Sequence, residues 1–151
     1  MNRMNDKSRR VLMKNSTANP EEIAQFAGLA ENWWDPNGEF RPLHQLNPTR
    51  LTYIRNRLCK HFKRDHKIVK PLKGLTLVDV GCGGGLLTEP MCRLGATVTG
   101  IDAGKKTIKA ARHHANAVGL HIDYHQILPE ELSKEGHVFD IVLNMEVIEH
   151  V

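Results

Sequence analysis

The sequence predicts an α/β fold in which a parallel, doubly wound sheet follows two N-terminal helices. From residue 75 onward, short apolar runs alternate with helical segments, the first run ends in the glycines of 81–85, and the second ends in Asp102. Four strands are expected before Val151, whereas an open sheet of this kind usually has about six. We therefore expect the N-terminal part of a larger domain, incomplete at its C-terminus.

Composition divides the chain into three segments. Residues 1–19 are polar and basic and are expected to form a disordered N-terminus. Residues 20–73 are expected to form a helical cap with a tryptophan loop and a basic linker, and residues 74–151 are expected to form the ligand-binding domain. The strands of this domain are expected within 75–80, 96–102, 121–127 and 139–145, and its helices within 86–95 and 105–119.

Both N-terminal helices are expected to begin at an Asn-Pro pair, because asparagine caps a helix and proline suits its first turn. Asn19 and Pro20 would start the first helix, and Asn47 and Pro48 would start the second. The segment between the helices holds both tryptophans of the chain among Pro, Asn and Gly residues. Such turn formers predict a loop, and two adjacent indoles in a loop need a surface to lie against.

The charge of the chain is unevenly distributed. The net charge is +4, and residues 55–73 contain eight Lys or Arg against a single Asp. A solvated helix face is the ordinary interpretation of such a block, and attraction to an anionic membrane surface or to nucleic acid are the alternatives. Nucleic acid is the weaker of the two, because Phe62 is the one aromatic residue in the block that could stack on a base.

Targeting signals and cysteine spacing indicate the cellular compartment in which the protein is expected. No apolar run reaches the roughly 18 residues that a membrane helix needs, and the first residues lack the apolar core of a secretory signal. The three cysteines are never spaced as C-x-x-C, so reduced thiols are expected rather than disulfides or a zinc site. An intracellular protein is the resulting expectation.

A glycine loop follows the first expected strand, with the spacing Asp79-x-Gly81-x-Gly83-x-Gly85. In a doubly wound sheet a nucleotide-like ligand binds here. A dinucleotide fingerprint would need glycine at position 86, where the chain has leucine, and the acid before the loop would repel a pyrophosphate and attract a cation. Asp102 stands where a carboxylate can accept hydrogen bonds from ribose hydroxyls. A nicotinamide site and a glycine-rich turn beside a surface acid are the alternatives.

Two stretches, "FAGLAENWWDPNGEFRPLHQLNPTRLTYIRNRL" and "VDVGCGGGLLTEPMCRLGATVTGIDAG", resemble the ubiquinone-biosynthesis O-methyltransferases, the UbiG-type family of class I S-adenosylmethionine-dependent methyltransferases. The likeness covers residues 21–151. The W-W-D-x-x-G-E-F-x-P-L-H-x-x-N-P-x-R run carries most of it, because the glycine motif alone points only to the wide methyltransferase class. The resemblance implies a Rossmann-like fold in which residues 74–151 are the N-terminal part of the S-adenosylmethionine-binding domain.

The resemblance implies four residues that contact the methyl donor, S-adenosylmethionine: Arg50, Gly81, Asp102 and Met145. The planar guanidinium of Arg50 could pair with the carboxylate of the donor, and an ordinary surface arginine at a helix start is the alternative. The resemblance also implies that the two tryptophans cover the donor cleft. The alternative is a hydrophobic staple that holds the first helix to the sheet, and the two roles are compatible.

The resemblance further implies that Glu146, Glu149 and His150 bind a divalent metal, with magnesium the usual assignment. On a helix these side chains would share one face. Two carboxylates suit a hard cation, whereas imidazole fits zinc or manganese better, so the metal stays open. Acids placed for the helix dipole are the alternative. In that family the methyl group is accepted by a phenolic hydroxyl. This hydroxyl could lose its proton to His150 as the catalytic base, or the metal could lower its pKa.

Other positions carry weaker expectations. His113 and His114 lie in a segment rich in Lys and Arg and are expected to be solvated, and His44 is at most a minor contributor to the pocket. Methyltransferases often place an acid near the adenine amino group after the third strand. The chain has Leu128-Pro129-Glu130 there, which leaves that contact open.

The resulting expectation is an enzyme that methylates phenolic hydroxyls of polyprenylated intermediates of ubiquinone synthesis, namely 2-polyprenyl-6-hydroxyphenol and 3-demethylubiquinol. The alternatives are a methyltransferase for another small hydroxylated molecule and a truncated donor-binding remnant, at most part of a quinone-biosynthesis assembly. Such substrates reside in membranes, so we expect peripheral contact from the bacterial cytoplasm with the inner membrane, or from the matrix side with the mitochondrial inner membrane. Nucleic acid is not an expected partner.

Overall fold

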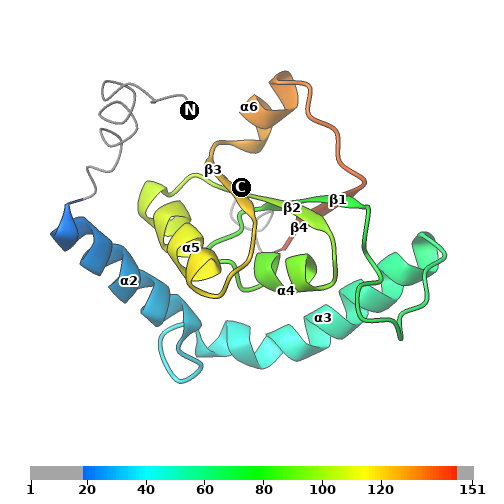
Figure 1. The fold of residues 1–151 in the computed structure, drawn as a ribbon, viewed down its shortest axis with the longest axis horizontal. Helices are drawn as coiled ribbons and strands as arrows, with labels where there is room; N and C mark the ends of the chain where they lie inside the picture. Colours follow the sequence, from blue (N-terminus) through cyan, green and yellow to red (C-terminus); the bar gives the residue numbers. More distant parts are fainter. Residues whose placement is uncertain (1–18, 146–151) are drawn as a thin grey trace, which may run out of the picture.

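The computed structural model describes residues 19–145, so the expectation of disorder for the N-terminus concerns residues outside this range. With the labels of Figure 1, the helices α2 (Pro20–Trp34) and α3 (Arg41–His61) precede alternating strands and helices. These elements are β1 (Thr76–Val80), α4 (Thr88–Arg93), β2 (Thr97–Asp102), α5 (Lys105–Ala117), β3 (Asp123–Gln126), α6 (Pro129–Lys134) and β4 (Ile141–Asn144). The alternation confirms the predicted α/β class, and α6 is a helix that the sequence analysis did not predict.

The four strands form one sheet in the order β3-β2-β1-β4, and each neighbouring pair is parallel. Leu77 of β1 pairs with Val98 of β2 on one side and with Ile141 of β4 on the other. The strand order changes direction at β1, so the carboxyl ends of β1 and β4 flank the point at which doubly wound sheets bind their ligands. The predicted parallel, doubly wound sheet is confirmed for the described residues.

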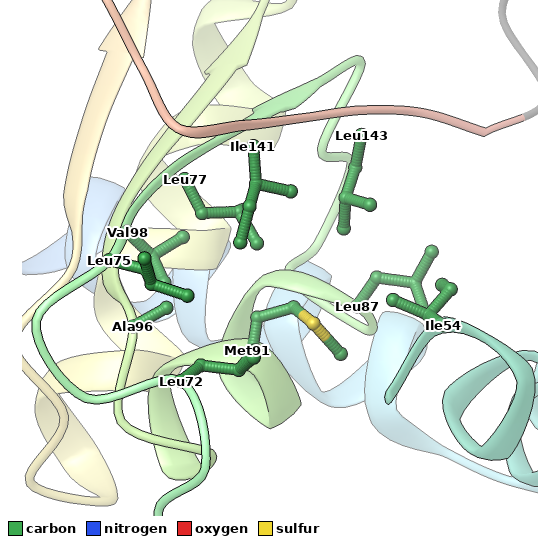
Figure 2. Close-up of a cluster of buried hydrophobic side chains, with 10 residues drawn as sticks. All are labelled: Ile54, Leu72, Leu75, Leu77, Leu87, Met91, Ala96, Val98, Ile141 and Leu143. Carbon is green, nitrogen blue, oxygen red and sulfur yellow. The ribbon is translucent and has the colours of Figure 1, made fainter. Parts of the chain in front are cut away.

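Successive strand residues face opposite sides of the sheet, and helices cover both faces. On one face, side chains of β1, β2 and β4 pack with residues of α3 and α4 in the cluster of Figure 2. Tyr124 of β3 packs on α5 on this same face, and on the opposite face Val78 and Ile101 pack against Leu132 of α6. In Figure 1, α4 and α5 lie between the strands and the long helices α2 and α3. The cluster of Figure 2 contains Ile54, Leu72, Leu75, Leu77, Leu87, Met91, Ala96, Val98, Ile141 and Leu143.

The start of α2 is as predicted. Asn19 accepts a hydrogen bond on Oδ1 from the amide of Glu21 at 3.1 Å, and Pro20 occupies the first turn. The helix packs against α5, where Nζ of Lys109 lies 4.7 Å from the ring centroid of Phe26. The first N-terminal helix therefore lies on the outer side of the domain helix that follows β2.

Two boundaries in the cap differ from the predictions. α2 continues through Trp33 and Trp34, so the tryptophans end a helix instead of lying in a loop. α3 begins at Arg41 rather than at Pro48, which lies inside it. Pro at the first turn is accepted without loss, and here Pro42 has that position. The part of the helix before Pro48 makes two contacts outside α3, from His44 to the carbonyl of Trp33 and from Asn47 to the carbonyl of Leu86, and these tertiary contacts oppose the local proline signal.

Candidate functional site

The loop after β1 brings backbone rather than side chains to the carboxyl end of the sheet. Gly81, Gly83 and Gly85 have positive φ angles of 68°, 55° and 96°, a region that strongly favours glycine. The amide of Cys82 donates to the carbonyl of Ile101 at 2.9 Å, which ties the loop to β2. The alternating glycines of the motif are thus required by the turn itself.

Asp102 is the last residue of β2, and its carboxylate bonds to the backbone of two loops. Oδ2 accepts from the amide of Gly83 at 3.2 Å, and Oδ1 accepts from the amide of Gly104 at 2.8 Å. The structure therefore brings the predicted ribose acid together with the predicted glycine loop. Because a carboxylate can accept several hydrogen bonds, these two leave capacity for further donors.

Trp33 and Trp34 lie on the glycine loop, which answers what the two indoles cover. Trp34 donates from Nε1 to the carbonyl of Gly84 at 3.0 Å. Trp33 lies so close that a Cβ built at Gly84 would be 2.4 Å from its Cγ. Trp33 also stacks on Phe40, with ring centroids 3.7 Å apart. Both indoles thus join the end of α2 to the loop, and Phe40 is a partner that the sequence analysis missed.

A cavity of about 170 Å³ opens at the switch point between β1 and β4. Arg50 from α3, Gly81 from the loop and Met145 after β4 all line it. Asp102 is not part of this lining and reaches the cavity wall through its bond to Gly83. The lining residues are Trp33, Leu43, Asn47, Arg50, Asp79, Gly81, Cys82, Gly83, Leu86, Leu87 and Met145.

Asp79 is a buried carboxyl in the lining of this cavity. Its exposed fraction is 3%, and Thr88 donates from Oγ1 to its Oδ2 at 2.8 Å. Burial raises the pKa of Asp79 to about 7, the hydrogen bond from Thr88 opposes this shift, and the negative charge of Asp102 adds to it. A cation in the cavity would favour the ionised form of this carboxyl.

Asn47 was predicted to cap a helix, and this prediction is wrong. It lies inside α3 and lines the cavity. Its Nδ2 donates to the carbonyl of Leu86 at 2.8 Å. Its Oδ1 is buried and has no hydrogen-bond partner among the described residues. A buried acceptor without a donor costs free energy, so this atom fits a ligand that offers N–H groups. The contact spans 39 positions of the chain, and no local pattern could have shown it.

His114 is not solvated, which corrects the prediction. Its Nδ1 lies 2.7 Å from Oε1 of the buried Glu89. Its ring stacks on Trp34, with centroids 4.0 Å apart and planes inclined by 4°. Spacing on α5 carried a signal for this, because Ala110 and Ala111 are fully buried and lie four and three residues before His114.

The other histidines and the loop after β3 are also placed. Nε2 of His44 lies 2.8 Å from the carbonyl of Trp33, so this residue helps to hold the tryptophan segment. His113 is half-buried. The amide of Leu128 donates to Oε2 of Glu131 at 3.1 Å at the start of α6, and the adenine contact stays open.

The predicted metal ligands and the predicted base, Glu146, Glu149 and His150, lie outside the described residues. Within residues 19–145 no group of three or more His, Cys, Asp or Glu side chains is arranged to hold a metal ion. The metal and the base therefore stay predictions.

The fold and the sequence of residues 78–151 are similar to those of methyltransferases. A family model described as "Methyltransferase domain" matches residues 78–151. Magnesium protoporphyrin IX methyltransferase (ChlM) from Synechocystis PCC 6803, solved with bound SAM, has a TM-score of 0.61 and 21% identity over 100% of this chain and 66% of that chain. The same enzyme with bound SAH has a TM-score of 0.59 and 21% identity over 95% of this chain and 60% of that chain. The fold is that of the class I methyltransferases.

Sequence relatives narrow the class. The ubiquinone biosynthesis O-methyltransferase of Rhizobium leguminosarum bv. trifolii (strain WSM2304) is 54% identical over 90% of this chain and 54% of its own length. That of Paramagnetospirillum magneticum (strain ATCC 700264 / AMB-1) is 54% identical over 89% of this chain and 54% of its own length. The chain spans about half the length of the curated relatives it matches. The expected resemblance is confirmed: over about nine-tenths of its length the chain is similar to ubiquinone biosynthesis O-methyltransferases.

Gly84→Ala tests the packing of Trp33 on the loop. Gly84 does not have a positive φ, so its added Cβ should act only by displacing the indole that lies 2.4 Å from it. We expect a loss of about 1–3 kcal/mol in the free energy of unfolding and a red shift of tryptophan emission. The control is Gly28→Ala inside α2, where a Cβ meets nothing within 4 Å and should stabilise the chain by about 0.5–1 kcal/mol. Unchanged emission in Gly84→Ala would contradict the packing.

Asp79→Asn tests the buried carboxyl through the pH dependence of stability. The folded carboxyl holds its proton up to about pH 7, whereas the unfolded one releases it near its ordinary pKa of 3.8. Between these values the folded state binds more protons, so wild-type stability should fall as pH rises, by on the order of 4 kcal/mol. Asp79→Asn cannot titrate and should lack this component. Denaturant unfolding of both proteins from pH 4 to pH 8 measures the difference, and parallel curves would contradict the assignment.

Proposed function

We propose that the chain is the donor-binding part of an S-adenosylmethionine-dependent O-methyltransferase of ubiquinone biosynthesis, acting on phenolic hydroxyls of polyprenylated intermediates. The observation that carries this proposal is the cavity at the switch point, which combines a buried acid, an arginine and a glycine loop. The choice of reaction is supported by relatives that are 54% identical over about nine-tenths of this chain.

The polar groups of the cavity fit the amino-acid end of the donor. That end carries an ammonium group and a carboxylate, and the donor has no phosphate for a helix terminus to bind. Asp79 and the unpaired Oδ1 of Asn47 would accept hydrogen bonds from the ammonium group. Arg50 would pair with the carboxylate through two parallel N–H bonds.

The remaining walls fit the nucleoside end. At Gly81 the loop would let the donor approach the backbone closely, because no Cβ intervenes there. Asp102 lies beside Gly83 and would accept hydrogen bonds from the ribose hydroxyls. Trp33 and Met145 supply apolar surface to the same cavity, which would exclude water from it.

The donor, when bound, supplies a methyl group that is already activated by the sulfonium charge, so the task of the chain is alignment. Arg50 and Asp79 would fix one end of the donor and Asp102 the other. His150 is the proposed acceptor of the phenol proton, and Glu146, Glu149 and His150 are the proposed ligands of a divalent metal such as magnesium. The roles of these three residues rest on the resemblance alone.

Arg50→Gln tests the donor site. Loss of a charged hydrogen bond of about 1.5–3 kcal/mol should weaken binding of S-adenosylhomocysteine by about 10- to 100-fold, measured by titration calorimetry. Arg57→Gln is the matched control, because Arg57 lies two turns further along α3 and is exposed. Equal weakening in both variants, or wild-type binding of a nicotinamide dinucleotide in place of the nucleoside, would overturn the proposal.

Methyl transfer to a polyprenyl phenol, compared with catechol, separates the proposed substrate from other hydroxylated molecules.

We further propose that the basic block contacts an anionic membrane, where polyprenylated substrates reside. Lys60, Lys63, Lys67 and Lys70 are exposed, and Ile68 and Val69 between the last two are 51% and 85% exposed. Lysines that flank exposed apolar residues suit adsorption to lipid headgroups. No helix within residues 19–145 is both long and apolar enough to cross a bilayer. The relatives reported above are bacterial, which supports the cytoplasmic side of the inner membrane over the mitochondrial alternative for this contact.

Substitution of Lys60, Lys63, Lys67 and Lys70 by glutamine should abolish most binding to vesicles containing phosphatidylglycerol, since each lysine near such a surface contributes about 1 kcal/mol. Co-sedimentation measures the bound fraction. Arg64 is left intact because it donates to the carbonyl of Lys73 at 3.2 Å. The control variant replaces the exposed Lys105 and Lys106 of α5. Vesicle binding that is unchanged in the fourfold variant would exclude this surface.

A further inference from the structure

The contact between Trp34, His114 and Glu89 joins three helices, and none of these residues lines the cavity described above. Trp34 ends α2, His114 lies on α5, and Glu89 lies on α4. The Glu89 side chain is 2% exposed and that of His114 is 23% exposed. One edge of the Trp34 indole bonds to the glycine loop through Nε1, and its ring stacks on the imidazole.

The imidazole cannot rotate freely while it is bonded to Glu89. The distance from its Nδ1 to Oε1 of Glu89 is 2.7 Å. A buried carboxylate that lost this partner would remain unpaired, which is strongly unfavourable. The bond to Glu89 therefore restricts the orientation of the His114 ring. The Trp34 indole lies parallel to this ring, because the two planes are inclined by only 4°.

α2 packs against α5, but most of its side chains outside the tryptophan end are half-buried or exposed. Ala30 is its one fully buried residue, and Ile23, which the apolar pattern places on the packed face, is 47% exposed. Partial burial contributes less hydrophobic stabilisation than full burial of the same side chains would. The aromatic contacts at the C-terminal end of α2 therefore add to its docking, and they lie beside Trp33, which contacts Gly83 and Gly84.

We propose that His114, oriented by Glu89, is a positioning residue for the donor site: it fixes Trp34 on the glycine loop and so holds Trp33 against the wall of the donor cavity. This inference rests on the proposed function, because it assumes that the donor occupies that cavity. It adds that docking of α2 and binding of the donor are coupled. Each should strengthen the other by the same factor.

The test uses the 151-residue chain and four of its variants. His114→Asn keeps an N–H donor for Glu89 and removes the stacked ring, whereas Glu89→Leu removes the acceptor and leaves no buried charge. Glu89→Gln is the conservative variant, because its amide oxygen can still accept from the imidazole. His113→Asn is the control on the adjacent position of α5. Both tryptophans of the chain belong to this region, so emission and acrylamide quenching report on it alone.

We expect His114→Asn and Glu89→Leu to keep the far-ultraviolet circular dichroism of the wild type, to shift tryptophan emission to longer wavelength, and to weaken S-adenosylhomocysteine binding by about 2- to 10-fold, the range for loss of one aromatic pair. Glu89→Gln and His113→Asn should remain within about twofold of the wild type. If His114→Asn fails to fold, Glu89→Leu decides.

Three results would overturn the proposal. Affinity that stays unchanged while emission shifts would mean that the stack only stabilises α2. Equal weakening in His113→Asn would mean that any change on α5 has this effect. If the wild type does not bind S-adenosylhomocysteine, both the proposed function and this inference are overturned. If the wild type binds it and His114→Asn and Glu89→Leu bind it equally well, only this inference is overturned.

Discussion

Parallel pairing of β1 with β2 and β4 is the interaction on which the rest of the site depends. Because the three strands run in one direction, their carboxyl ends meet at one edge of the sheet. The glycine loop follows β1, Asp102 ends β2, and Met145 follows β4. Residues separated by more than 60 positions therefore share one cavity wall. The apolar cluster of Figure 2 supports this pairing, since it packs strand residues of β1, β2 and β4 on α3 and α4.

Two acids at this edge are treated differently by their surroundings. Asp102 receives hydrogen bonds from two backbone amides. Asp79 is buried and receives one bond from a hydroxyl, and its pKa is raised. The charge of Asp102 contributes to that shift. Asp102 thus holds the glycine loop, and a cation in the cavity would favour the ionised form of Asp79.

The two N-terminal helices are part of the site rather than an appendage. α3 contributes Arg50 and Asn47 to the cavity, and α2 contributes Trp33. The indole takes the space that side chains at Gly83 and Gly84 would fill, so the glycines serve both the turn and the docking of α2. Removing either element would leave apolar and polar groups of the loop without partners.

The sequence by itself determined the alternation of strands and helices, the glycine loop, the acid after β2 and the cap of α2. Each of these depends on residues that are close together in the chain. Periodicity, glycine spacing and capping act over a few residues, so they could be recognised in the sequence. The position of the tryptophans on the loop, the Asn47 contact with Leu86 and the burial of His114 against Glu89 were decided by the tertiary structure. These contacts join segments 25 to 50 positions apart, and their free energy overrode the proline and turn signals that had predicted a loop at 33–34 and a helix start at 48.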